Sequence, residues 1–293
     1  MCAGWITEPQ PLEKIAEPPV VTKMVAPGGY KESIMLYGKA KVGKTMACCS
    51  VIDEAIKVNP NVIIHYVCTD NGLEQTLEYY FGERTNEIKT KHLRLHKVYE
   101  FRKDDTVPFF TQVASMFFDI RSMAKPSDWL IVDLADKFWG FAQDTWLEQS
   151  AVQNVTTTYI ADAAKDLKKF MEFNKSQWQF IKRLDNIATF DIADNAPCNI
   201  LYVFGEKPLE FGEDLTKRKE EAETRIASDI FDLVGCKPAG QGMLPYSFST
   251  IVYLCGLKDK KFVVLGDRGH SLDYTEKLFG RNWYQAFCAE RKK

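Results

Sequence analysis

The sequence predicts an α/β domain built on a mostly parallel β-sheet that is flanked by helices. Short apolar runs at residues 33–37, 62–68, 129–133 and 199–204 each have the composition of a buried strand, because parallel strands covered on both faces are apolar throughout. Segments of helical character separate these runs, and strands that alternate with helices imply parallel pairing through right-handed crossovers. The 293 residues suffice for one large domain of this kind.

The first 32 residues are predicted to form an extended arm, because they carry five prolines and a Gly28-Gly29 pair without apolar periodicity. A buried strand over Ser33–Tyr37 comes next. The elements predicted up to residue 123 are then a helix over Thr45–Val58 ended by Asn59-Pro60, a strand over Val62–Cys68, a helix over Leu73–Phe81, a strand over His92–Tyr99 and a helix over Val107–Met123.

The second half continues the alternation around a helical insert at residues 136–195. Core strands are predicted at Trp129–Asp133 and Asn199–Phe204, with a charged loop and a helix over 206–229. Strands over Thr250–Leu257 and Lys261–Leu265, joined by a Lys258-Asp259-Lys260 turn, form a terminal hairpin. The predicted domain therefore spans residues 33–273, and a last helix occupies 274–293.

Composition and charge point to a soluble protein of a reducing compartment. The formal net charge of −2 provides no global positive field for nucleic acid, so any such contact must come from local patches. None of the eight cysteines forms a Cys-x-x-Cys pair, and scattered thiols in apolar runs behave as small hydrophobes. No stretch approaches the roughly 20 apolar residues of a membrane span, and the N-terminus lacks the apolar core of a signal peptide. We expect a cytoplasmic protein without membrane contact (in the host cytoplasm if the chain is viral).

A complete phosphate-binding motif is the most specific feature of the sequence. Residues 38–45 match G-x-x-x-x-G-K-[ST], with an apolar strand before the motif and a helix after it. Backbone N–H groups of such a loop and the N-terminal end of the helix bind phosphate oxygens. Lys44 would reach the β- and γ-phosphates of ATP, and the Thr45 hydroxyl would ligate Mg²⁺. The predicted nucleotide-binding residues are Gly38, Lys39, Ala40, Lys41, Val42, Gly43, Lys44, Thr45 and Met46.

An acidic residue at the end of the third core strand is the candidate Mg²⁺ carboxylate. Trp129–Val132 are apolar and Asp133 follows them, so Asp133 would emerge at the carboxyl edge of the sheet beside the phosphates and hold the metal directly or through water. Leu134 stands where AAA+ ATPases usually carry a glutamate that activates water. Asp136 is a second candidate acid, with a cap or a solvated loop residue as its alternative.

The order of these parts resembles the RecA-like P-loop ATPases, in particular the compact phage-type AAA domain proteins related to recombination ATPases. The resemblance covers roughly residues 30–270 and implies a RecA-like sheet, ATP and Mg²⁺ as cofactors, and assembly into a homo-oligomer. It implies that Asp70, at the end of the second strand, polarises the attacking water, although a helix N-cap is an equal alternative.

The resemblance also suggests roles for two further residues. Glu206, or Lys207, follows the strand at 199–204 and would sense the γ-phosphate, where the family usually has an uncharged Gln or a His; a solvated turn is the alternative. Arg268 would act as an arginine finger in a neighbouring subunit's site, and its alternative is an exposed Asp-Arg-Gly turn.

Single-stranded DNA is the partner that the resemblance suggests. The loop Gly235–Pro245 would line a channel through a ring, where modest charge per subunit adds along a bound strand. Two basic clusters are neutralised by nearby acids and fit a solvated face better: Lys89, Lys91, Arg94, Lys97, Arg102 and Lys103, and Lys217, Arg218 and Lys219.

The expected function is Mg²⁺-dependent ATP hydrolysis coupled to DNA recombination, replication or repair. A small-molecule or nucleotide kinase is one alternative, for which residues 217–225 would be a poor lid because acids alternate with the basic residues. A nucleotide-gated packaging or scaffolding component, in which hydrolysis is incidental, is the other.

Overall fold

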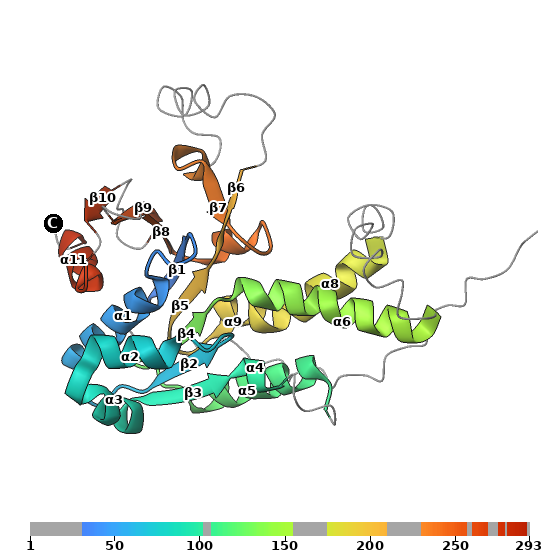
Figure 1. Cartoon of the computed structure of the whole chain (residues 1–293), viewed down its shortest axis with the longest axis horizontal. Helices are drawn as coiled ribbons and strands as arrows, with labels where there is room; N and C mark the ends of the chain where they lie inside the picture. The colour runs from blue at the N-terminus through green and yellow to red at the C-terminus, as the bar shows by residue number, and fades with distance from the viewer. Residues whose placement is uncertain are drawn as a thin grey trace, which may run out of the picture.

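An eight-stranded, mostly parallel sheet in the order β10-β9-β8-β1-β5-β4-β2-β3 forms the centre of the protein (Figure 1). The computed structural model describes residues 31–101, 107–154, 175–209, 230–256, 260–268, 275–278 and 280–291. The strands of this sheet are β1 (Ser33–Gly38), β2 (Ile64–Cys68), β3 (Leu93–Lys97), β4 (Trp129–Asp133), β5 (Asn199–Phe204), β8 (Thr250–Cys255), β9 (Lys261–Asp267) and β10 (Thr275–Leu278).

Strand pairing places the carboxyl ends of the central strands at one edge of the sheet. Strand β1 lies between β5 and β8 and is parallel to both, and β4 and β2 continue the parallel set as far as β3. Only β9 and β10 add antiparallel pairs. Strand β5 therefore separates the strand that leads into the phosphate loop from the strand that ends at Asp133.

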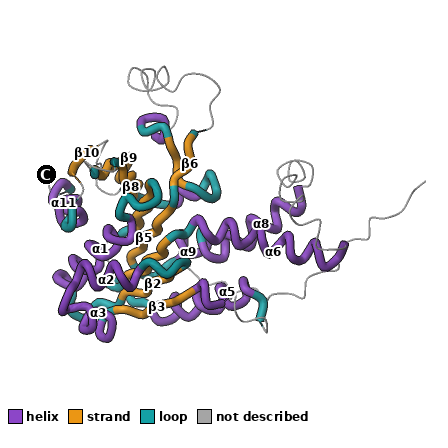
Figure 2. Tube along the Cα trace, viewed as in Figure 1, coloured by secondary structure: helices purple, strands orange, loops and turns teal. Residues whose placement is uncertain are grey.

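Helices cover both faces of the sheet, and the sheet separates the core into two apolar clusters, one on each face. One face is covered by α1 (Lys44–Val58), α2 (Leu73–Phe81), α3 (Thr85–Lys91) and α11 (Trp283–Glu290). The other face is covered by α5 (Phe109–Met123), α6 (Asp136–Asn154), α8 (Lys175–Ala188) and α9 (Phe190–Asn195), with the short α4 (Val98–Phe101) after β3. Figure 2 shows α6 and α8 side by side, extending away from the sheet. None of the described helices combines the length and apolar character needed to cross a membrane.

The α/β class, the parallel sheet and the antiparallel β8–β9 pairing confirm the sequence-based expectations. The prediction of one helix over 274–293 is wrong, because Thr275–Leu278 pair with β9 as an edge strand and the helix begins only at Trp283. Residues 1–30 of the expected arm (1–32) lie outside the described residues, as do residues 258 and 259 of the expected hairpin turn (258–260) and the middle of the helical insert (155–174).

A second correction concerns the segments after β5. Residues 206–208 are not loop but strand β6 (Glu206–Pro208), which pairs with β7 (Cys236–Pro238) in a small antiparallel sheet. The loop proposed at Gly235–Pro245 is therefore partly strand, and its end lies in the 3-10 helix Leu244–Ser247. Another 3-10 helix, Ile230–Leu233, leads into β7, and a third, Gly82–Arg84, joins α2 to α3. Residues 210–229, with the predicted helix, the second basic cluster and the poor lid, lie outside the described residues.

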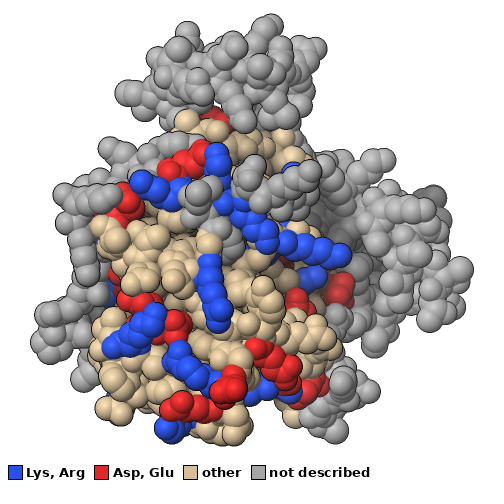
Figure 3. Space-filling view, turned by 60° about the vertical axis from the view of Figure 1, so that its left-hand side comes forward, with Lys and Arg blue, Asp and Glu red and all other residues tan. Residues whose placement is uncertain are grey.

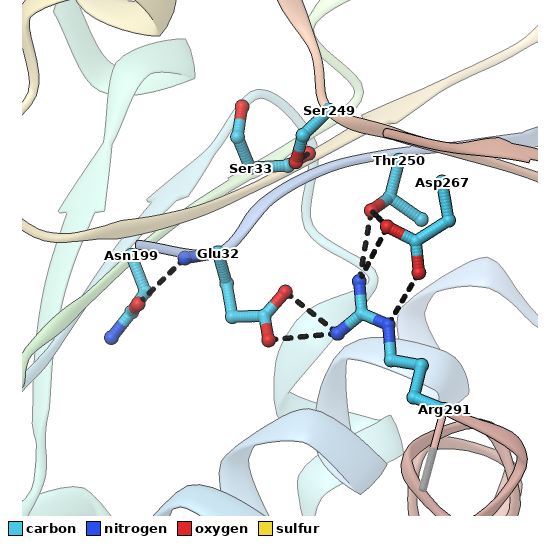
Figure 4. A network of polar contacts seen from close by, with 7 residues as sticks. All are labelled: Glu32, Ser33, Asn199, Ser249, Thr250, Asp267 and Arg291. Atoms are coloured by element: carbon cyan, nitrogen blue, oxygen red, sulfur yellow. Dashed lines mark hydrogen bonds and ion pairs between the residues drawn. The ribbon is translucent and has the colours of Figure 1, made fainter. Parts of the chain in front are cut away.

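A polar network holds α11 to the amino edge of the sheet, which is the end where the parallel strands begin (Figure 4). The Arg291 guanidinium contacts both carboxylate oxygens of Glu32 at 2.7 and 2.8 Å and Asp267 Oδ2 at 2.6 Å. It also donates to Thr250 Oγ1 at 2.9 Å, and the Thr250 hydroxyl donates to Asp267 at 2.9 Å. This network joins the last helix to β8, to β9 and to the residue that precedes β1.

Candidate active site

The phosphate-binding motif forms a tight loop between β1 and α1. Lys41 has φ 63° and Gly43 has φ 109°, so both residues adopt the left-handed backbone conformation that turns the chain into the helix. Lys39, Ala40 and Lys41 are exposed, whereas Val42 is buried. The N–H groups in the first turn of α1 lack intrahelical partners, and a loop of this shape directs N–H groups toward an anion.

Gly38 is required by the close approach of β8. A Cβ atom at this position would lie 2.4 Å from the backbone oxygen of Leu254, closer than any real contact. The first glycine of the motif thus allows β1 to pass β8 where the loop begins. Met46, one residue beyond Thr45 on α1, packs against the core on that face of the sheet.

The Lys44 side chain turns back onto the start of the phosphate loop. Its ammonium group donates to the backbone oxygens of Gly38 at 2.8 Å and of Lys39 at 2.6 Å. Burial lowers the pKa of Lys44, and the surrounding carboxylates oppose that shift: Asp133, Asp136, Glu206 and Asp70. The sheet therefore gathers four acids around the motif lysine.

Asp133 contacts the motif directly. Its Oδ2 accepts a hydrogen bond from the Thr45 hydroxyl at 2.9 Å and another from the Tyr66 hydroxyl at 2.7 Å, and Oδ1 accepts from the Leu134 N–H at 3.2 Å. Burial raises the pKa of the Asp133 carboxyl, and the bonds from Tyr66 and Thr45 oppose that rise. A hydroxyl that donates its proton to Asp133 keeps its lone pairs for a cation.

The backbone after Asp133 turns sharply. Leu134 has φ 46°, a left-handed conformation that is uncommon for a residue other than glycine and that clusters at functional sites. The Thr69 hydroxyl donates to the backbone oxygens of Asp133 and Leu134 at 2.9 and 3.1 Å. Asp136 begins α6 and accepts the Gly205 N–H at 2.9 Å. The ends of β2, β4 and β5 are thereby tied together.

Glu206 lies beside the phosphate loop, at the start of β6. Its Oε1 is 4.0 Å from Lys39 Nζ, and its Oε2 accepts from the Tyr253 hydroxyl at 3.0 Å. The Cys236 thiol is 3.8 Å from the same oxygen. The Glu206 side chain is only 13% exposed and is fixed by these contacts. The alternative interpretation, a solvated turn, is therefore wrong for this residue.

Asp70 lies at the same edge but is exposed. Its Oδ1 accepts the Gly72 N–H at 3.0 Å, a turn that leads into α2. The carboxylate still lies close enough to oppose the lowering of the Lys44 pKa by burial, with the smallest effect of the four acids.

Arg268 is at the opposite edge of the sheet from the phosphate loop. Thr250 pairs with both Ile34 and Asp267, so Asp267 is level with a residue four positions before Gly38. At roughly 3.3 Å per residue, Arg268 is about 15 Å along the strands from the loop. Its guanidinium contacts the backbone oxygen of Tyr246 at 3.5 Å. Within one chain, Arg268 cannot reach a nucleotide at Lys44.

The basic residues of the first cluster that the structure describes are mostly paired with acids. Lys91 lies 2.8 Å from Glu87, and Lys89 and Lys97 each lie 3.5 Å from Glu74. Acidic and basic side chains are also interspersed on the face shown in Figure 3. These contacts support a solvated face. Arg102 and Lys103 lie outside the described residues.

Among the described residues, no group of three or more His, Cys, Asp and Glu side chains is arranged to hold a metal ion by itself. Thr45 and Asp133 fit Mg²⁺ nonetheless, because this ion keeps several waters and is usually held by one or two protein oxygens together with substrate phosphates. A comparison with protein-family models finds no match for this chain, and a comparison with curated proteins finds none either.

Sequence reasoning missed Tyr66, in β2, and Thr69, directly after that strand, whose hydroxyls bond the Asp133 side chain and backbone. The available signal was weak. A tyrosine in an apolar strand needs a polar partner when it is buried, and Tyr66 sits in the strand next to the one that ends at Asp133.

Proposed function

We propose that this chain binds ATP together with Mg²⁺ at the phosphate loop and hydrolyses it, as a member of the RecA-like class. The observation that carries the proposal is the 2.9 Å contact between Thr45 and Asp133, which unites two motifs 88 residues apart. A strand-loop-helix phosphate cradle with a hydroxyl bonded to a buried carboxylate is the arrangement that Mg²⁺-nucleotide binding needs.

Each residue then has a defined task. The Lys44 ammonium group would leave the backbone oxygens of Gly38 and Lys39 and bind the β- and γ-phosphate oxygens. The Thr45 hydroxyl would donate to Asp133 and offer its lone pairs to Mg²⁺. The Asp133 carboxylate would hold the metal directly or through water. Asp70 accepts the proton of the water that attacks the γ-phosphorus as ADP leaves, and Glu206 contacts the loop beside that phosphate. Catalysis of this kind is mostly positioning and charge neutralisation.

The resemblance to recombination ATPases supports single-stranded DNA as the partner and a homo-oligomer as the working form, in DNA recombination, replication or repair. The position of Arg268 adds a geometric condition. A residue at the amino edge can meet a nucleotide at the carboxyl edge only in a neighbouring subunit, which requires head-to-tail contacts that form rings or filaments.

The first test measures the Mg²⁺-ATPase rate with and without single-stranded DNA, with Lys44→Ala as the blank. We expect turnover that Lys44→Ala abolishes and DNA stimulates about tenfold or more, with Asp70→Asn retaining ATP binding but losing turnover. Tight ATP binding with no turnover under either condition would instead favour a nucleotide-gated scaffold. Phosphate transfer that appears only with a hydroxyl acceptor would favour a kinase.

A mixing experiment tests the oligomer. Lys44→Ala subunits keep Arg268, and Arg268→Ala subunits keep an intact phosphate loop. If Arg268 acts across an interface, each variant alone is inactive and the mixture regains part of the wild-type rate. If Arg268→Ala alone has the wild-type rate, Arg268 is no finger.

A further inference from the structure

Tyr66 is a buried tyrosine that faces the proposed metal site. It lies in the middle of β2, has no exposed surface, and belongs to the apolar cluster beneath α1. Its hydroxyl donates to Asp133 Oδ2 at 2.7 Å, a bond between two groups on adjacent parallel strands. A hydrogen bond to a charged acceptor is shorter and stronger than one to a neutral acceptor.

The same carboxylate oxygen receives the Thr45 hydroxyl. Thr45 donates to Asp133 Oδ2 at 2.9 Å, while the Leu134 N–H binds Oδ1 at 3.2 Å. Asp133 is therefore held from three directions, and Tyr66 supplies the shortest of these bonds. Because the Tyr66 hydroxyl binds Oδ2 from the core side, it fixes the rotation of the Asp133 carboxylate about its side-chain bond. The Thr45 hydroxyl then has Oδ2 as its defined acceptor.

Two other buried tyrosines of the sheet, Tyr202 and Tyr37, use a different kind of partner. The Tyr202 hydroxyl donates to the backbone oxygen of Ala188 at 2.9 Å, and the Tyr37 hydroxyl donates to that of Cys236 at 3.3 Å. A backbone carbonyl satisfies a buried hydroxyl without affecting any functional group. Tyr66 differs in that its acceptor is the carboxylate of the candidate metal site.

We propose that Tyr66 is a positioning residue that sets the metal affinity of the Thr45–Asp133 pair. This inference rests on the proposed function, because it assumes that Asp133 and Thr45 bind Mg²⁺ with a nucleotide. Groups that orient metal-binding side chains through hydrogen bonds typically change metal affinity or activity by about 10- to 100-fold when they are removed. Tyr66 also interacts with the buried Cys48 thiol on α1, but its contact with the proposed metal site is the bond to the Asp133 carboxylate.

The test compares Tyr66→Phe with Tyr202→Phe, a matched control that also removes one hydroxyl from a fully buried tyrosine of the same sheet. Mn²⁺ binding is measured by electron paramagnetic resonance in the presence of a non-hydrolysable ATP analogue, which reads metal affinity without turnover. We expect Tyr66→Phe to weaken Mn²⁺ binding about tenfold or more and Tyr202→Phe to leave it unchanged. Fluorescent nucleotide bound in EDTA should have equal affinity in all three proteins.

In the ATPase assay the same change appears as a higher half-saturating Mg²⁺ concentration, with the rate at saturating Mg²⁺ largely restored. Equal Mn²⁺ affinity in Tyr66→Phe and Tyr202→Phe overturns the proposal, as does a lower saturated rate with unchanged metal dependence. A wild-type chain that binds neither nucleotide nor Mn²⁺ refutes the proposed function itself, and the role of Tyr66 with it. A wild-type chain that binds both, beside an unaltered Tyr66→Phe, refutes the role of Tyr66 alone.

Discussion

Removing the Arg291 guanidinium tests whether the amino-edge network holds the last helix in place. The side chains of Arg291 and Asp267 are 4% and 0% exposed, whereas that of Glu32 is 20% exposed. In Arg291→Met, Glu32 can be rehydrated but the Asp267 carboxylate cannot. Breaking a buried pair by removing one partner costs about 3–5 kcal/mol, and we expect the lower half of that range because half of the network reaches water. At about 2 to 4 °C per kcal/mol for a large domain, a loss of about 3–4 kcal/mol should lower the midpoint of thermal unfolding by about 6–16 °C.

Urea unfolding, followed by circular dichroism and by the fluorescence of buried tryptophans such as Trp283, measures this loss. Lys277→Met is the matched control, because Lys277 Nζ lies 3.4 Å from Glu290 of the same helix but the pair is 44% and 20% exposed, and a surface pair contributes at most about 1 kcal/mol. In a double-mutant cycle, Arg291→Met and Asp267→Asn together should cost at least about 1 kcal/mol less than the sum of the single changes. A loss from Arg291→Met no larger than that from Lys277→Met, or an additive cycle, would refute the reasoning.

Two further predictions concern stability. Gly38→Ala places a Cβ atom 2.4 Å from the Leu254 oxygen, which forces β1 and β8 apart and should cost about 1–3 kcal/mol in urea unfolding; wild-type stability would contradict the close approach. Burial raises the pKa of Asp185 to about 6, although Gln241 and Thr189 donate to the carboxyl. The folded chain thus binds this proton more tightly than the unfolded chain, so stability decreases as the pH rises from about 4 to about 6. Asp185→Asn should remove that decrease and stabilise the protein at pH 7 by about 2–3 kcal/mol; an unchanged pH profile of unfolding would contradict it.

Most of the sheet could be predicted because its central strands are buried on both faces. The apolar runs Trp129–Asp133 and Asn199–Phe204 match β4 and β5 to the residue, since burial on both sides leaves few polar positions to blur the pattern. The edge strand β10 could not be found in this way. Its residues, Thr275-Glu276-Lys277-Leu278, are half charged, a composition that suits an exposed edge, and only the neighbouring β9 makes them a strand.

The candidate site also has a part that could be predicted from the sequence and a part that could not. The phosphate loop is local in sequence, so its residues and its chemistry could be predicted together. Contacts between strand ends depend on register, which the sequence does not state. The bond from Gly205 to Asp136 and the bond from Tyr66 to Asp133 both join residues more than 60 positions apart. For Arg268, both its place after a strand and the antiparallel hairpin were predicted, and together they put it at the end of the sheet away from the phosphate loop.

Strand β1 connects the two networks on which these experiments depend. Its amino end follows Glu32, which Arg291 holds, and its carboxyl end is Gly38, where the phosphate loop begins. Because β1 is buried between β5 and β8 along its length, the amino-edge network should support the loop only through the stability of the whole domain. Arg291→Met should therefore lower stability while the folded protein keeps its metal affinity. Tyr66→Phe should lower metal affinity, with a loss of stability no greater than that of Tyr202→Phe. An Arg291 variant that also weakened Mn²⁺ binding in the folded state would mean that strain passes along β1, and that the two edges are not independent.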